Sequence, residues 1–170
     1  MKATGLGWRG KYGRPGSSSL LAMIAANYVA AVILMACAVL MSDIMSLLPT
    51  APKETGYLAC LHFSAIALAP GAAILYGCQW FWLVVTGRVK GVTWGGAVVY
   101  GALIGLADVP VAGLIMGALS GIPLQGLLIG LVILLIHPGT SFSMLVAGSA
   151  MGTGNGIAAS SWIAKWRASR

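Results

Sequence analysis

Charged side chains are scarce in this sequence, and their scarcity limits what the chain can be. They make up 8% of the 170 residues, whereas 59% of the residues are hydrophobic. An ordinary soluble domain carries about 25% charged residues. Because so few polar side chains cannot cover the surface of a water-soluble globule, the composition predicts an all-α integral membrane protein.

Acids, histidines and enzyme motifs are equally scarce. The acids are Asp43, Glu54 and Asp108, and there are two histidines and three cysteines. No HExxH, CxxC, GxSxG or P-loop pattern occurs, and the cysteines stand inside apolar runs without the paired spacing of a metal site. We therefore expect no enzyme, no metal site and no cofactor.

Nine of the ten bases are grouped at the ends of the apolar runs, and only Lys53 lies elsewhere. Four precede the first run, Arg88 and Lys90 follow the second, and three end the sequence. Bases in such positions mark cytoplasmic loops, so we interpret them as topology signals and not as a nucleic-acid surface. The prediction is a basic cytoplasmic arm at 1–17, one transmembrane domain at 18–164 and a basic cytoplasmic tail at 165–170. Its partner is the lipid bilayer of a bacterial inner membrane.

Three stretches are long and apolar enough to cross the ~30 Å hydrocarbon layer: 18–41, 57–85 and 92–121. Pro70 and Pro110 should kink the second and third stretches, because proline removes a backbone hydrogen bond from a helix.

The last third of the chain allows two readings. In one, a single helix kinked at Pro138 crosses at 122–146 and a surface segment follows. In the other, a short helix ends at His137 and a fifth span covers 141–164. Four spans leave nine of the ten bases cytoplasmic, whereas five leave six, so the charge distribution favours a bundle of four transmembrane helices, with five as the alternative.

Asp108 is the one acid near the middle of an apolar run, and Pro110 follows it closely. A carboxyl group at mid-membrane is costly and is a candidate for proton or ion handling. The alternative is a protonated side chain that donates a hydrogen bond to a neighbouring helix. His137 and His62 are candidate partners for a proton relay. Asn27 is the strongly polar residue of the first span. It is expected to form a hydrogen bond to another helix, and contact with a ligand is the alternative.

Small residues recur every four positions along the third span. This row places one smooth face on the helix, which allows a second backbone to approach closely. The partner is expected within the same chain, with a second copy or another membrane protein as the alternative. The residues that we assign to helix packing are Ala97, Gly101, Gly105, Gly113, Gly117 and Gly121.

The sequence thus favours a small transport protein, namely a proton-linked carrier, a channel or the membrane component of a larger transporter. The alternative is a non-catalytic accessory subunit that packs against a homo- or hetero-oligomeric membrane complex through the small-residue face. Asp108 separates the two, because transport requires the carboxyl group to gain and lose a proton.

Overall fold

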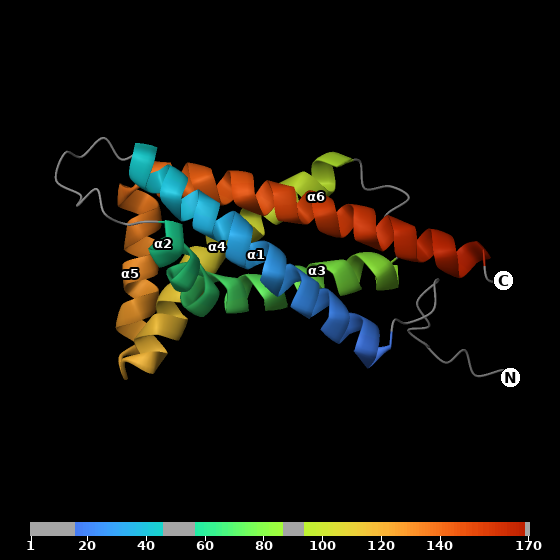
Figure 1. Ribbon diagram of the computed structural model, residues 1–170, viewed down its shortest axis with the longest axis horizontal. Coiled ribbons are helices and arrows are strands. Elements are labelled where there is room, and N and C mark those ends of the chain that lie inside the picture. The colour runs from blue at the N-terminus through green and yellow to red at the C-terminus, as the bar shows by residue number, and fades with distance from the viewer. Residues whose placement is uncertain (1–15, 46–56, 87–93, 169–170) are drawn as a thin grey trace, which may run out of the picture.

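The computed structural model describes residues 16–45, 57–86 and 94–168, and all of the secondary structure in these ranges is helical (Figure 1). The prediction of an all-α protein is confirmed. Three of its helical stretches are long and apolar enough to cross a membrane, and a bent pair of helices makes a fourth if it is counted as one span. The elements are α1 Ser17–Met45, α2 Tyr57–Phe63, η1 Ser64–Leu68, α3 Ala69–Thr86, α4 Trp94–Leu119, α5 Pro123–Ile136 and α6 Pro138–Ala168.

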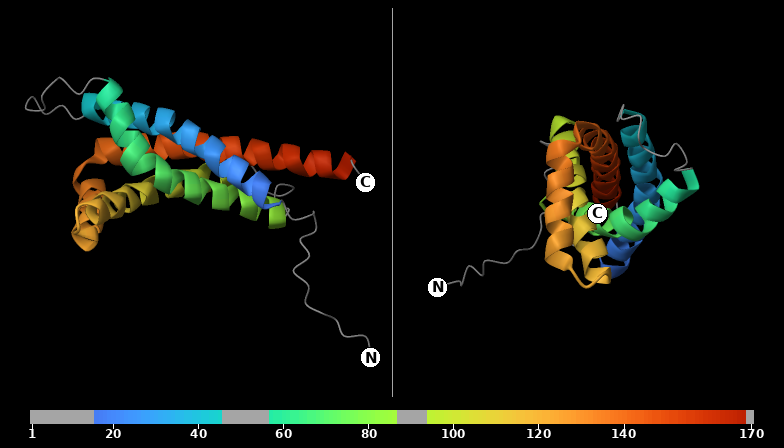
Figure 2. Two further views of the ribbon diagram at one scale, coloured as in Figure 1. Left: turned by 60° about the horizontal axis from the view of Figure 1, so that its bottom comes forward. Right: turned by 90° about the vertical axis from the view of Figure 1, so that its left-hand side faces the viewer.

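The long helices run back and forth along one axis. α1 and α6 are antiparallel neighbours, α2, η1 and α3 form one continuous second rod, and α4 returns beside α6 (Figures 1 and 2). α1 begins and α6 ends at the same end of the bundle. At the opposite end, α5 lies across the bundle and packs mainly on α4.

The last third of the chain differs from the favoured prediction. Instead of one kinked helix at 122–146 followed by a surface segment, two helices meet at an angle of 98°. Pro138 is not a kink inside a helix, since it is the first residue of α6. A helix start accommodates proline, because the first N–H groups of a helix have no partner within the helix. The helix boundaries follow the alternative reading, but α5 turns across the bundle instead of running along it.

A π-helical segment, η1, precedes Pro70 in the second rod. The N–H of Ala69 bonds to the carbonyl of Ser64, five residues back. In the same register the carbonyl of Ala65 would pair with Pro70, which has no N–H. The hydroxyl of Tyr28 on α1 donates to that carbonyl at 3.1 Å. A neighbouring helix thus supplies the donor that proline lacks.

Pro110 lies inside α4 without ending it. The interior around the proline-bearing helices is built largely from small side chains, and Ala31, Ala67, Ala69 and Ala72 are all 0% exposed. Small side chains let the helix axes come close, so the backbones themselves make much of the packing. This close packing positions the polar groups described next.

Candidate functional site

Asp108 stands at nearly the same helical angle as Gly101 and Ala112, on the packed side of α4, and its side chain is 0% exposed. Neither carboxyl oxygen has a hydrogen-bond partner among the described residues. Buried polar atoms in folded proteins are nearly always paired, so an unpaired buried carboxyl group requires an explanation. An ionised carboxylate without a donor or a positive charge nearby would be very costly, and the neutral, protonated form fits this environment.

The carboxyl group lies close to Gly71 on α3. A Cβ atom placed at Gly71 would lie 2.6 Å from Oδ1 of Asp108 and 2.8 Å from Cγ1 of Val111. Both distances are shorter than real contacts, so only glycine leaves room for the acid. The Pro70–Gly71 pair and the Asp108–Pro110 segment therefore meet, and two helix irregularities adjoin the same buried acid.

Further polar groups follow α3 from this point towards the end of the bundle where α1 begins. The hydroxyl of Tyr76 donates to the carbonyl of Gly101 at 2.8 Å. Nδ2 of Asn155 on α6 donates to the carbonyl of Tyr76 at 3.2 Å and lies 3.5 Å from Oε1 of Gln79. Nε2 of Gln79 is buried and has no hydrogen-bond partner in the part of the chain that the structure describes. We call Asp108, Tyr76, Asn155 and Gln79 the polar seam.

The other candidate residues lie apart from Asp108. His62 is exposed on α2, and His137 is half-buried at the junction of α5 and α6. No hydrogen bond joins either histidine to the carboxyl group. That junction lies at the end of the bundle and not near its middle (Figure 1), so the expected mid-membrane Asp108–His137 pair is not formed.

Asn27 also behaves differently from the expectation. Its side chain is buried, but Nδ2 donates to the carbonyl of Met23 at 2.9 Å, one turn earlier in the same helix. The amide thus satisfies itself locally, and the expected bond to another helix is not made. Among the described residues, no group of three or more metal-ligating side chains is close enough to hold an ion.

The small-residue row of α4 packs on two different helices of the same chain. Near the start of α4, Cβ atoms at Gly101 and Gly105 would meet the backbone of Gly148 and Gly152 on α6. Past Pro110, Cβ atoms at Gly113 and Gly117 would meet the backbone of Gly126 on α5. The same face of α4 therefore contacts α6 before Pro110 and α5 after it. The contact with α6 reaches back to Ala97, whose carbonyl lies against Gly152.

Gly121 was predicted to belong to the packing row of α4, and this prediction is wrong. Its φ is +77°, and nothing lies within 4 Å of a Cβ atom placed there. This left-handed backbone forms the turn between α4 and α5, where glycine carries no steric penalty. The four-residue spacing is a coincidence at this position, because α4 ends before it.

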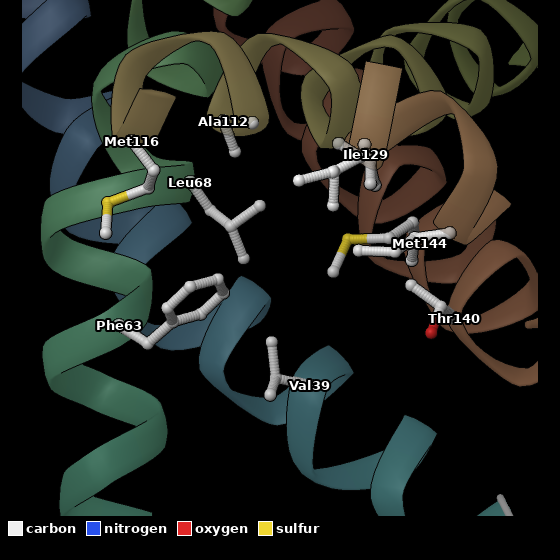
Figure 3. A pocket seen from close by; sticks show the side chains of 12 residues that line it. Val39, Phe63, Leu68, Ala112, Met116, Ile129, Thr140 and Met144 are labelled. Atoms are coloured by element: carbon white, nitrogen blue, oxygen red, sulfur yellow. The ribbon is translucent and has the colours of Figure 1, made fainter. Parts of the chain in front are cut away.

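An apolar cavity of about 370 Å³ lies beside the acid, between α1, the second rod, α4, α5 and α6 (Figure 3). It does not include Asp108, but Val109 and Leu68 line it. Leu68 ends η1 just before Pro70, and Val109 immediately precedes Pro110. The cavity therefore touches both proline-bearing helices where they meet.

Several residues of this region were missed from sequence. Gly126 and Gly130 on α5, and Gly148 and Gly152 on α6, are themselves GxxxG pairs, so the partner faces could have been found by the same spacing rule. Gly71 and Tyr76 carry no such signal, because their role depends on which helix lies opposite. Comparison of the chain with protein-family models, with curated proteins and with solved structures gives no match.

Proposed function

We propose that this chain is a small transport protein of a bacterial inner membrane, in which Asp108 binds and releases a proton. In this proposal α1, the second rod and α4 each cross the membrane, and the bent α5–α6 pair counts as the fourth span. In this topology the end of the bundle where α1 starts and α6 ends faces the cytoplasm, and the opposite end faces the outside.

The unpaired, fully buried carboxyl group of Asp108 carries this proposal. If the acid were only a hydrogen-bond donor between helices, an acceptor would face it, and none does among the described residues. Intramembrane acids are rare and are functional by default. A proton carrier needs such a group to be neutral when sealed and to ionise when water reaches it.

Access to water requires a second arrangement of the helices, because the described one seals Asp108 completely. The polar seam offers the route, since Tyr76, Asn155 and Gln79 follow α3 from the acid towards the cytoplasmic end. The breaks at Pro70 and Pro110 adjoin the acid, and discontinuous helices at membrane depth are where transporters change shape around a bound ion. We therefore regard the structure as the closed, protonated state.

An accessory subunit is the second candidate, and the complete burial of Asp108 favours it. In that case the acid never opens to water and the protein serves only as a packing partner in a larger complex. The two functions differ in one property, the exchange of the Asp108 proton with bulk water, so that property should be measured directly.

The test is proton movement in sealed vesicles that contain the purified protein and an internal pH-sensitive dye. A proton carrier should speed the decay of an imposed pH difference several-fold over empty vesicles, and Asp108→Asn should abolish the increase while the protein still inserts. Asn27→Ala, which removes a buried amide whose hydrogen bond stays within α1, serves as the matched control and should retain the increase. If wild type and Asp108→Asn both behave like empty vesicles in the presence of a membrane potential of either sign, the transport proposal is wrong and the accessory role is favoured.

A further inference from the structure

The apolar cavity has a built floor and an open rim. The floor consists of Leu68, Val109, Ala112 and Met144, which are 2, 7, 4 and 2% exposed. They come from η1, α4 and α6, so three elements that are distant in sequence form the buried inner side of the cavity. Figure 3 shows the side chains of Leu68, Ala112 and Met144 pointing towards a common centre.

The rim opens to the outside of the bundle through apolar side chains. Phe63, Met116 and Ile129 line the cavity and are 46, 38 and 56% exposed. They belong to α2, α4 and α5. In a membrane the medium beyond such a rim is hydrocarbon, so whatever enters does so from the lipid and not from water.

The chemistry of the lining selects a hydrocarbon. Thr140 carries the one hydroxyl among the twelve lining side chains, and none of them is charged. Water needs two to four polar partners to occupy a cavity, whereas an apolar cavity of about 150 Å³ takes up benzene. By that comparison, the 370 Å³ here accommodates a hydrocarbon chain of roughly ten to fifteen carbons.

We infer that this cavity is a binding site for one acyl chain of a membrane lipid, which enters between α2 and α5 and ends on Leu68 and Val109. The inference rests on the membrane insertion proposed above, but not on proton movement. It makes a lipid acyl chain a ligand of the region around Asp108. The end of the acyl chain contacts Val109, which directly precedes Pro110, and Leu68, which lies two residues before Pro70. A filled cavity would hold the two proline-bearing helices in the described arrangement.

Photo-crosslinking tests this site in the intact protein. The protein is placed in vesicles of phosphatidylethanolamine and phosphatidylglycerol with a trace of a phospholipid that carries a diazirine at the end of one acyl chain. After illumination, the labelled residues are mapped by mass spectrometry. We expect labelling at Met144 and Val109 on the buried floor, in addition to general labelling of exposed apolar positions within a span such as Ile74 on α3, which is 57% exposed.

A matched pair of variants identifies the cavity as the cause. Ala112→Leu fills the floor and should reduce floor labelling at least five-fold, while labelling at Ile74 is unchanged. Ala107→Leu makes the same change on an exposed part of α4 outside the cavity lining and should alter neither. If Ala112→Leu does not fold, Val39→Phe fills the same cavity from α1.

Each remaining outcome is decisive. Labelled Ile74 with an unlabelled floor would overturn the inference, and so would floor residues crosslinked to a second copy of the chain instead of lipid. Absence of labelling at Ile74 would instead contradict membrane insertion. Asp108→Asn should keep the floor labelling, so loss of proton movement and loss of lipid binding are distinguishable.

Discussion

The carboxyl group of Asp108 on α4 lies against the backbone of Gly71 on α3, directly after Pro70, with no space for a side chain between them. This contact joins two residues that lie on different helices and are far apart in the sequence. A buried acid alone does not define a site, and a Pro–Gly pair alone predicts only a bend. Together they place a protonatable group where two irregular helices meet.

Gly71→Ala should destabilise the protein, because the new methyl group would overlap both Asp108 and Val111. We expect a loss of about 1–3 kcal/mol, which is typical for overpacking. Unfolding by denaturing detergent, followed by circular dichroism, measures the change. Gly154→Ala is the control, since nothing lies within 4 Å of that position, and alanine should be neutral or stabilise the helix by up to about 1 kcal/mol. Equal behaviour of the two variants would show that the α3–α4 contact is looser than described.

Asp108→Ala should leave the folded protein no less stable. No hydrogen bond of the carboxyl group is lost, and removal of an unpaired buried polar group relieves a penalty of about 1–3 kcal/mol, which offsets the small cavity left behind. A structural hydrogen-bond donor would behave oppositely, with a loss of about 0.6–1.7 kcal/mol. The same unfolding assay decides between them, and a clear loss of stability in Asp108→Ala would return the acid to a structural role.

The two halves of the small-residue row should respond differently to substitution. Gly101→Ala pushes α4 away from α6, which is central to the bundle, so we expect global destabilisation or loss of folded protein. Gly113→Ala separates α4 from α5, which lies across one end. Hydrogen exchange should therefore increase in α5 while α1, α3 and α6 stay protected. Uniform loss of protection in both variants would mean that α5 is not a separate unit.

The small-residue face of α4 was predictable because its spacing is local, and a four-residue repeat in a helix places side chains on one face whatever lies opposite. The burial of Asp108 followed from the same angle. Gly71 and the polar seam were not predictable, because they depend on which surface of α3 meets α4. The sequence places no limit on that choice beyond apolarity, since all faces of these helices are hydrophobic.

The direction of α5 was also beyond the sequence. Its fourteen residues are too few for a span alone, and the distribution of bases favoured one kinked span that joined it to the residues after Pro138. The structure instead breaks the backbone at His137, with φ −116° and ψ 83°, and at the left-handed Gly121. These two local conformations turn α5 across the bundle. Each conformation is adopted by one residue. Whether it is favourable depends on the packing of Gly126 and Gly130 against the backbone of α4.

Topology follows from the same geometry and can be measured with single cysteines. If α5 lies across the outer end of the bundle, Ser120 and His137, which flank it, are on the same side of the membrane. We expect Ser120→Cys and His137→Cys, each in a background where Cys37, Cys60 and Cys78 are replaced by alanine, to react with a membrane-impermeant maleimide added to intact cells.

A reporter fused after Arg170 should in turn be cytoplasmic, because nine of the ten bases then lie inside. In a five-span arrangement α5 itself would cross, so Ser120 and His137 would label from opposite sides and the reporter would be external. That pair of results would replace the four-span proposal and place the junction of α5 and α6 in the cytoplasm.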